Sequence, residues 1–421
     1  MQKIVIRGGN RLEGSVQASG AKNAALPLMY ASILTSEEID LHRVPCLKDI
    51  LTAKQLLLQL GVQLDDLSAG TLKIKAREII DHTAPYEMVK TMRASVLVLG
   101  PLMGREGRAV VSLPGGCAIG ARPIDQHLKG LEAMGADIEL EGGYVRAKAR
   151  KLKGANFTFD LKTVTGVENL MMAASLAEGT TVLRNCAIEP EINELANLIN
   201  GMGGSVDVSN SETIVIEGKN QLHGFSHQIM PDRIEAGTHL IAGAITRGDV
   251  RVRDCEPAHL LPLLEKLEQT GLNVEIGEHE ARVISNGRMK STDVTTNPYP
   301  GFATDLQAQY MALMALAHGR CKITENVFEN RFMHVQELVR MGARIKVSAR
   351  TAELEGVEEL SGAHVQATDL RASACLILAG LAAKGVTEVH RVYHLDRGYE
   401  RIEEKLRKLG ADIRRETDII L

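Results

Sequence analysis

The sequence predicts an α/β protein of two domains, each made of three repeats with helices inside and sheets outside. The chain has 421 residues, too many for one ordinary core, and length alone predicts two or three domains. A Gly-centred ending recurs six times at intervals of 68 to 74 residues, which indicates six related units. The six endings are Leu60-Gly61, Met134-Gly135, Met202-Gly203, Thr270-Gly271, Met341-Gly342 and Leu409-Gly410.

Each repeat contains two helices of different character. The helix before the ending is amphipathic, as in Tyr399 to Leu409, and a strand pattern such as 411–414 follows it. The other helix is rich in Ala, Leu, Met and Ser on nearly every face, so we expect it to be buried all round. These predicted interior helices span 21–33, 92–103, 169–177, 234–246, 306–318 and 370–384.

Polar residues recur where the interior helices begin. If the interior helices of a domain run parallel, their N-termini converge, and each carries roughly half a positive charge. Two such ends facing each other would form a deep anion-binding cleft between the domains. The polar residues are Lys22, Asn23, Arg93, Thr165, Arg233, Asp305, Asp369 and Arg371.

One cysteine, Cys117, lies in the Gly-rich stretch 112–123, five residues before Arg122. The second repeat is the longest between interior helix and ending, with 28 residues against 23 to 25, and the excess falls in this stretch. The glycines favour a mobile lid, and a nearby guanidinium lowers a thiol pKa. We therefore expect an anion-facing acid or nucleophile at Cys117; the alternative is a cysteine that packs as a small buried hydrophobe. The remaining cysteines are predicted to be packing residues: Cys46, Cys186, Cys255, Cys321 and Cys375.

Composition excludes several classes of function. The net charge is −4, so no global basic field attracts nucleic acid or an anionic membrane. Trp is absent and aromatic residues make up 3%, which removes the stacking platforms of single-strand binders. Scattered cysteines, no signal-peptide core and no long apolar run predict a soluble cytoplasmic protein, either a monomer or a weak homo-oligomer. The sequence contains no dinucleotide-binding motif, P-loop or metal-binding motif, so we expect neither a cofactor nor a metal.

Seven long motifs lie at 19–27, 90–95, 113–123, 231–238, 328–334, 368–373 and 396–401. Together they resemble, from end to end, the UDP-N-acetylglucosamine enolpyruvyl transferases of the enolpyruvyl transferase family. The resemblance implies two inside-out α/β barrels of three repeats each, with the active site in the cleft between them. One domain would span 22–231 and carry the Cys117 loop, and the other would combine 1–21 with 232–421.

The resemblance also implies an activity. The enolpyruvyl group of phosphoenolpyruvate moves to the 3′-hydroxyl of UDP-N-acetylglucosamine through a tetrahedral ketal, and phosphate is released. This is the first committed step of peptidoglycan synthesis, on which cell shape and division depend, and it uses no cofactor. Cys117 would be the acid, Asp305 the base, and fosfomycin would alkylate the thiol.

Site residues follow from the same motifs, residue by residue. Lys22 and Arg397 match catalytic positions, and Asp369 is either a proton-handling or a structural residue. The predicted phosphoenolpyruvate contacts are Lys22, Asn23, Arg122, Arg397, Arg331 and Arg371. The predicted UDP-N-acetylglucosamine contacts are Asn23, Arg93, Arg122, Pro123, Ile124, Asp125, Gln126, His127, Lys162, Thr163, Val164, Thr165, Asp305 and Val327.

Three alternatives remain open at the level of the sequence. The related transfer to shikimate 3-phosphate shares the architecture, and the Cys117 loop argues against it. A non-catalytic ring of six repeats, such as a DNA sliding clamp, would need basic rather than apolar helices. A catalytically silent regulatory paralogue would not need Lys22, Cys117, Arg122, Asp305 and Arg397 together.

Overall fold

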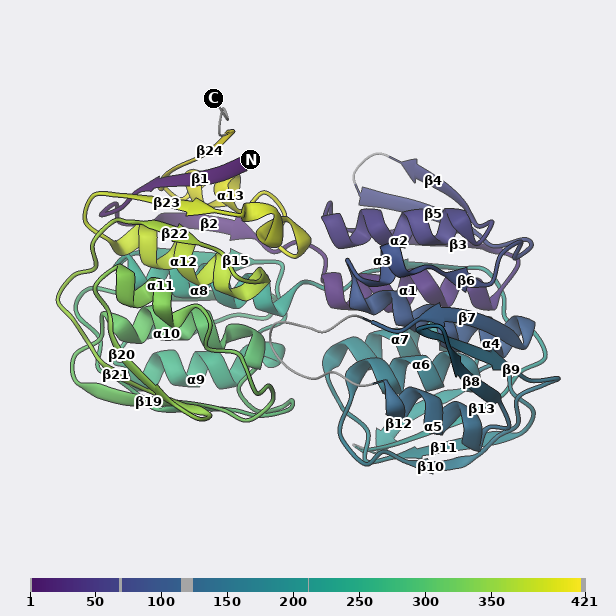
Figure 1. The fold of residues 1–421 in the computed structure, drawn as a ribbon. Helices are drawn as coiled ribbons and strands as arrows, with labels where there is room; N and C mark the ends of the chain where they lie inside the picture. The colour runs from purple at the N-terminus through teal and green to yellow at the C-terminus, as the bar shows by residue number, and fades with distance from the viewer. Residues whose placement is uncertain (1, 68–69, 115–123, 211, 418–421) are drawn as a thin grey trace. The chain divides into compact units, whose positions relative to one another are not determined.

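The computed structural model of the protein describes residues 2–67, 70–114, 124–210 and 212–417. These residues divide into two compact units (Figure 1). The first unit comprises residues 20–114 and 124–230, and the second comprises residues 2–19 and 231–417. Each unit has its own hydrophobic core, and the two cores share no residue. None of the helices in the described part of the chain is long and apolar enough to cross a membrane.

The first unit contains three four-stranded sheets with one common topology. An edge strand runs parallel to its neighbour, and the two further strands are antiparallel. In order across each sheet, the strands are β14 (Phe225–Gln228), β3 (Glu38–His42), β5 (Thr71–Lys75) and β4 (Gln63–Leu67); β6 (Thr83–Ala84), β7 (Arg108–Ser112), β9 (Tyr144–Lys148) and β8 (Asp137–Glu141); β10 (Asn156–Thr158), β11 (Thr180–Arg184), β13 (Thr213–Glu217) and β12 (Val206–Asn210).

The second unit repeats this topology three times, and the N-terminal strands complete two of its sheets. Strand β1 lies between β23 and β24, and β2 runs parallel to β15 (Figure 1). In order, the strands are β2 (Glu13–Gln17), β15 (Asp249–Arg253), β17 (Glu280–Ile284) and β16 (Asn273–Ile276); β18 (Val294–Thr296), β19 (Arg320–Glu325), β21 (Thr351–Glu355) and β20 (Arg344–Ser348); β22 (His364–Gln366), β23 (Val386–His390), β1 (Gln2–Arg7) and β24 (Asp412–Thr417).

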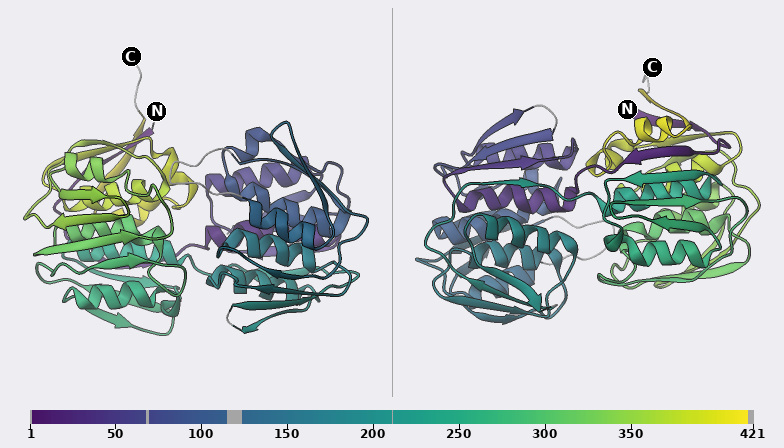
Figure 2. Two further views of the ribbon diagram at one scale, coloured as in Figure 1. Left: turned by 60° about the horizontal axis from the view of Figure 1, so that its bottom comes forward. Right: turned by 180° about the vertical axis from the view of Figure 1, so that it is seen from behind.

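Apolar helices occupy the interior of each unit, and the sheets lie outside them (Figure 2). Their residues are buried on nearly every face, whereas strands such as β5 and β21 alternate buried and more exposed positions. The predicted fold class is therefore confirmed. The interior helices are α1 (Lys22–Ala31) with η1 (Ser32–Leu34), η3 (Arg93–Val98) with α4 (Leu99–Glu106), α6 (Val164–Ala174), α8 (Arg233–Ile245), η5 (Thr304–Leu306) with α10 (Gln307–Ala315), and α12 (Leu370–Ala382).

The outer helices are amphipathic and end where the six repeats predict. In one of them Leu57 is buried while its neighbour Leu58 is 55% exposed. The glycine that closes each repeat has φ between 88° and 104°, a region that disfavours side chains, and this explains the recurring Gly. The outer helices are α2 (Lys48–Gln59), α5 (Asp125–Ala133), α7 (Pro190–Gly201), α9 (Leu261–Gln269), α11 (Val335–Arg340) and α13 (Ile402–Lys408); short helices are α3 (Tyr86–Val89), η4 (Pro257–Leu260) and η6 (Val392–Arg397).

Two predicted helix starts are wrong. Helix α6 begins at Val164 rather than 169, because Thr163 Oγ1 accepts a hydrogen bond from Gly166 N at 3.2 Å and caps the helix. Helix α13 begins at Ile402 rather than Tyr399. The Tyr399 side chain is buried, and its hydroxyl lies 3.0 Å from Thr238 Oγ1, so this residue belongs to the core rather than to the helix.

The helix predicted over 92–103 is wound as a 3₁₀-helix in its first half. In an α-helix Gly100 N would donate to Val96 O, but the buried side chain of Asn169 intercepts both groups. Asn169 Oδ1 accepts from Gly100 N, and its Nδ2 donates to Val96 O at 3.2 Å. Pro101 also lacks the N–H that would bond to Leu97. A tertiary contact therefore sets the winding here.

A buried ion pair fixes the N-terminal segment to the second unit. Lys405 Nζ on α13 lies 2.6 Å from Glu235 Oε1 on α8 and donates to Ser19 Oγ at 2.7 Å. The other carboxylate oxygen of Glu235 accepts from Ser19 N at 2.6 Å. Burial raises the pKa of Glu235, although the charge of Lys405 opposes this shift. Lys405 therefore compensates a carboxylate that the core would otherwise keep neutral.

We predict that Lys405→Met destabilises the second unit by about 3–5 kcal/mol, because it leaves the buried Glu235 carboxylate unpaired. Urea unfolding monitored by circular dichroism would show the shift in midpoint. Lys408→Met, an exposed change on the same helix, is the matched control and should have little effect. Adding Glu235→Gln to Lys405→Met should restore part of the loss; equal stability of Lys405→Met and wild type would contradict the prediction.

Candidate active site

In the second unit, the carboxylate of Asp305 is held by two arginines. Asp305 lies in η5, just before α10. Arg331 Nη2 lies 2.6 Å from Asp305 Oδ1, while Arg371 Nε and Nη2 lie 3.0 and 2.7 Å from Oδ2. Both arginines are at least 90% buried. Three of the predicted site residues therefore form one cluster, which we call the Asp305 cluster.

The charges in the Asp305 cluster control its protonation. Burial alone would raise the pKa of Asp305, but the charges of Arg371 and then Arg331 outweigh burial and hold it well below its usual value. Burial lowers the pKa of Arg371, and the Asp305 carboxylate raises it above its ordinary range. In this arrangement Asp305 is ionised and weakly basic.

The same cluster lies where three interior helices begin. Arg371 is in the first turn of α12, and Asp305 directly precedes α10. Gln309, in the first turn of α10, donates to Thr238 Oγ1 on α8 at 3.2 Å and to Tyr399 OH at 3.0 Å. The three helices therefore start at one end of the second unit, which confirms the predicted parallel arrangement there and concentrates positive helix ends.

A second buried carboxylate, Glu325, is linked to the Asp305 cluster through Thr304. Its Oε2 accepts from Thr304 Oγ1 at 2.8 Å, and Thr304 Oγ1 in turn accepts from Arg331 Nη1 at 2.7 Å. Its Oε1 accepts from Val327 N at 2.8 Å, so the backbone of this predicted contact residue is held by Glu325. Sequence reasoning missed Glu325, because a Glu at the end of a strand carries no distinguishing signal.

Asp369 and Arg397 lie near the same helix ends. Asp369 caps α12, since its Oδ1 accepts from Arg371 N at 2.8 Å and Ala372 N at 3.0 Å. Arg397 is the last residue of η6, two residues before Tyr399. The Arg371 guanidinium lies over the Tyr399 ring at 5.4 Å, so Tyr399 joins the segment of Arg397 to the Asp305 cluster. Sequence reasoning also missed this role of Tyr399.

In the first unit, Lys22 and Asn23 open α1. Lys22 Nζ lies 3.2 Å from Asp49 Oδ2 on α2, and both side chains are largely buried. Asn23, the next residue, is exposed. A buried lysine at a helix start adds a fixed positive charge to the helix end, which suits an anionic ligand.

His127 is buried between α5 and α6. Its Nδ1 lies 2.8 Å from Asn169 Nδ2, and its Nε2 lies 3.4 Å from Thr165 Oγ1. Burial, with the charge of Arg93 second, lowers the pKa of His127 to about 3. The imidazole is therefore neutral at physiological pH and serves as a hydrogen-bonding group, while Asn169 ties it to the interior helices.

The other described contact residues surround His127 in sequence and space. Gln126 Nε2 donates to Asp125 Oδ2 and to Asp160 Oδ2, both at 2.9 Å. Lys162 Nζ lies 2.5 Å from Glu212 Oε1. Ile124 precedes α5, Thr163 caps α6, and Val164 is its first residue. Cys117, Arg122 and Pro123 lie outside the described residues.

The packing prediction for the other cysteines holds for four of five. Cys186, Cys255, Cys321 and Cys375 are buried, and burial raises the pKa of Cys186 to about 12. Cys46 is exposed, so the prediction for it is wrong. It lies in a loop just before α2, between the buried residues Pro45 and Leu47.

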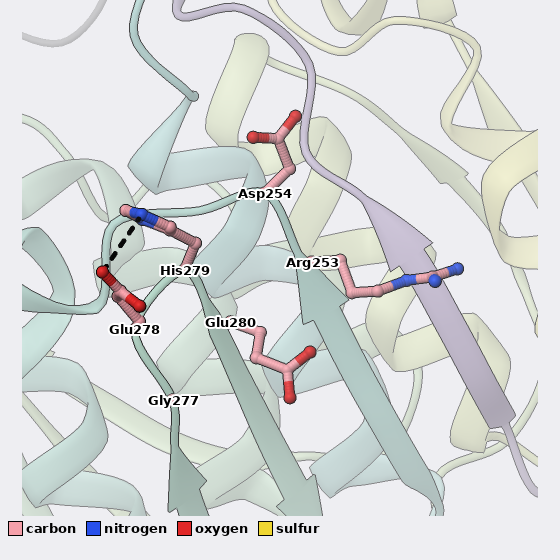
Figure 3. Close-up of a pocket in the computed structure, with 6 residues that line it drawn as sticks. All are labelled: Arg253, Asp254, Gly277, Glu278, His279 and Glu280. Carbon is pink, nitrogen blue, oxygen red and sulfur yellow. Dashed lines mark ion pairs between the residues drawn. The ribbon is translucent and has the colours of Figure 1, made fainter.

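A hollow of about 480 Å³ lies beside β15 and β17 (Figure 3). Arg253, Asp254 and the loop 277–280 line it. None of the described site residues predicted from the sequence belongs to this lining. His279 Nε2 and Glu278 Oε1, 3.9 Å apart, form the ion pair drawn there. We assign no substrate to this open, charged surface.

We predict that Arg331→Met raises the pKa of Asp305, because one of the two compensating charges is lost while burial remains. A carboxyl ¹³C NMR titration would measure it. Asp305 stabilises the fold above its unfolded pKa of about 3.9. That stabilisation disappears as pH falls through the folded pKa, so the variant should lose it at higher pH. Arg340→Met on α11, which pairs with Glu337 at 3.4 Å, is the control; an unchanged pKa in Arg331→Met would contradict the assignment.

Comparison with known proteins places the chain in a family. The model of EPSP synthase (3-phosphoshikimate 1-carboxyvinyltransferase) matches residues 6–406. Proteins named UDP-N-acetylglucosamine 1-carboxyvinyltransferase are similar along the whole chain, with 58% identity in Anaeromyxobacter dehalogenans (99% of both chains) and 54% in Koribacter versatilis (99% and 96%).

Solved structures agree. The enolpyruvyl transferase NikO from Streptomyces tendae superposes with a TM-score of 0.88 at 26% identity over 99% of both chains. An EPSP synthase from Acinetobacter baumannii gives a TM-score of 0.77 at 18% identity over 99% of this chain and 100% of that one, a likeness of fold. The chain therefore belongs to the EPSP synthase family of enolpyruvyl (1-carboxyvinyl) transferases.

Proposed function

We propose that this enzyme transfers the 1-carboxyvinyl group of phosphoenolpyruvate to the 3′-hydroxyl of UDP-N-acetylglucosamine and releases phosphate. The observation that carries the proposal is identity of 54 to 58% over nearly the full length with relatives that bear the name of this activity. The Asp305 cluster supports it, because two buried arginines and converging helix ends suit a small substrate with a phosphate and a carboxylate.

In the proposed reaction, the sugar hydroxyl attacks the central carbon of phosphoenolpyruvate while its methylene carbon gains a proton. A tetrahedral ketal forms, and loss of phosphate with loss of a methyl proton restores the double bond. Cys117 delivers the first proton, and Asp305 accepts the proton of the hydroxyl. Lys22, Arg122 and Arg397 hold the anionic groups of phosphoenolpyruvate.

Asp305 must become more basic to act. While both arginines hold it, its low pKa makes it a poor proton acceptor. We propose that the anionic groups of phosphoenolpyruvate compete for Arg331 and Arg371, weaken their contact with Asp305 and raise its pKa. Binding of one substrate would then prepare the base for the other.

His127 and its surroundings are proposed to receive the nucleotide sugar. The neutral imidazole, which Asn169 holds in place, is a hydrogen-bonding group without charge, while Arg93 and Lys162 supply charge for a diphosphate. Asn23, Asp125, Gln126, Val327 and the segment 163–165 complete the proposed contacts, with backbone groups sufficient for a uracil.

The remaining expectations stay predictions. They are a role in the first committed step of peptidoglycan synthesis, with effects on cell shape and division; a cytoplasmic location; a monomer or weak homo-oligomer; no nucleic-acid partner; and catalysis without a cofactor. That residues of both units serve one reaction, across the domains 22–231 and 1–21 plus 232–421, is also a prediction.

The family description favours one second candidate, transfer to 3-phosphoshikimate. The two acceptors differ in what must be bound, since one carries a nucleoside diphosphate and the other a single phosphate. Because the chain matches a family of transferases, a non-catalytic ring of repeats is disfavoured. A silent regulatory paralogue would show no turnover with either acceptor.

We predict that phosphate release from phosphoenolpyruvate requires UDP-N-acetylglucosamine, and that Cys117→Ala lowers kcat by about 10²–10⁴ because the acid is lost. Cys117→Asp should retain turnover. A continuous phosphate assay measures all three proteins, with Cys46→Ser, a change at an exposed cysteine, as control. Release that depends on 3-phosphoshikimate instead would support the second candidate.

Fosfomycin should alkylate one thiol of the native enzyme. Its electrophilic epoxide requires an accessible thiolate, and Cys186, Cys255, Cys321 and Cys375 are buried. Intact-mass analysis should show one adduct in the wild type and in Cys46→Ser, and none in Cys117→Asp, which should stay active in the inhibitor. An adduct that persists in Cys117→Asp would refute alkylation at this residue.

A further inference from the structure

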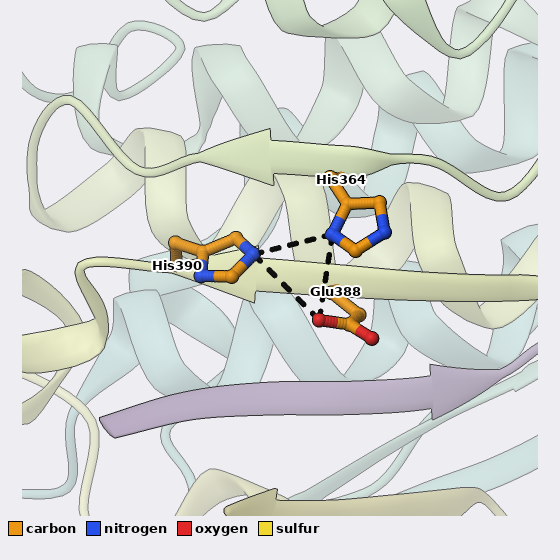
Figure 4. A group of neighbouring side chains, drawn as sticks. All are labelled: His364, Glu388 and His390. Atoms are coloured by element: carbon orange, nitrogen blue, oxygen red, sulfur yellow. Dashed lines mark hydrogen bonds and ion pairs between the residues drawn. The ribbon is translucent and has the colours of Figure 1, made fainter. Parts of the chain in front are cut away.

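Two histidines and a glutamate converge on the last sheet of the second unit (Figure 4). His364 Nδ1 lies 3.4 Å from Glu388 Oε2 and 3.4 Å from His390 Nε2, and the latter lies 3.7 Å from the same Oε2. In the part of the chain that the structure describes, this is the one group of three such residues whose ligand atoms all lie within 4.8 Å of one another.

Strand register brings the three side chains together. Strands β22 and β23 are parallel, with His364 opposite Glu388 and Gln366 opposite His390. Glu388 and His390 are two residues apart on one strand, so they share a face of the sheet with His364. No local sequence motif announces the group, because His364 meets the other two only through pairing.

The group is accessible and carries negative charge at its centre. The His364 side chain is 75% exposed, against 22% for Glu388 and 29% for His390. Lys3 Nζ on β1 lies 2.7 Å from Glu388 Oε2 and so occupies the same oxygen that faces both imidazoles.

Imidazole nitrogens and a carboxylate form a ligand set typical of zinc. Two His with one acidic residue leave a fourth position for water, and the exposed His364 side chain has room for the small movement needed for metal distances of about 2.0–2.2 Å. We propose that His364, Glu388 and His390 bind one Zn²⁺ ion, which Lys3 opposes by competing for Glu388.

Bound zinc would link the edge strand β22 to its neighbour β23. Strand β22 has three residues and ends the sheet order β22-β23-β1-β24. An ion held by one ligand from β22 and two from β23 would link these strands in the folded state alone, and therefore stabilise that state. In this proposal the ion stabilises the pairing of β22 with β23 and takes no part in the proposed transfer reaction.

The test is calorimetric titration of the metal-free full-length protein with Zn²⁺. The wild type should bind one more equivalent of Zn²⁺ than the double variant His364→Gln, His390→Gln, and Zn²⁺ should raise the melting temperature only where that equivalent binds. His279→Gln is the matched control, since His279 lies 3.8 Å from Glu256 and 3.9 Å from Glu278 without a second histidine. Equal stoichiometry in the wild type and the double variant would overturn the proposal.

Cysteine thiolates also bind zinc, so ligand identity needs its own readout. The Co²⁺ form of the site should show ligand-field bands without a thiolate charge-transfer band, and the double variant should lose those bands. If the signal of the wild type is a thiolate band and the double variant retains all of it, the metal is bound by cysteine. That result would contradict the proposal.

Lys3→Gln provides a test in which affinity should increase, a result that misfolding of the variant would not produce. Removing the competing ammonium group should tighten Zn²⁺ binding by about threefold to fivefold, the scale of a partly exposed ion pair. Lys322→Gln, which removes a more exposed cross-strand pair with Glu353 at 3.0 Å in another sheet, is the control and should leave affinity unchanged. Unchanged affinity in Lys3→Gln would show that Glu388 is not a ligand.

Discussion

The ion pairs of Asp305 with Arg331 and Arg371 are the constraint on which the second unit depends. Parallel interior helices bring their positive ends together, and two buried guanidinium groups add to that charge. A carboxylate at this point makes the arrangement stable, and it joins η5, α12 and the segment before α11. Under the proposed function, the anionic groups of phosphoenolpyruvate would compete with Asp305 for these two arginines.

In the first unit, neutral side chains make the buried polar contacts between the interior helices. Asn169 interrupts the backbone hydrogen bonds between η3 and α4, bonds to Gly100 N and Val96 O in their place and positions a neutral His127. Its positive charges come from Lys22 at a helix start and from Arg93. The two units therefore stabilise the starts of their interior helices with different groups.

Sequence periodicity was sufficient for the fold class, because the six glycines need positive φ and the interior helices are apolar all round. Periodicity did not predict the features that tertiary contacts determine. The start of α6, the 3₁₀ winding of 93–98 and the burial of Tyr399 depend on Thr163, Asn169 and partners far away in the chain. The resemblance supplied Asp305, Arg331 and Arg371 as site residues; their mutual pairing, and the support from Glu325, required the structure.

The most direct test of the account is the mass of the product. After incubation with phosphoenolpyruvate, the wild type should add a carboxyvinyl group to UDP-N-acetylglucosamine and leave 3-phosphoshikimate unchanged. Asp305→Asn, tested for folding in parallel, should form the same product about 10²–10⁴ times more slowly, as expected when a general base is removed. A carboxyvinyl group on 3-phosphoshikimate alone, or full activity in Asp305→Asn, would contradict the account.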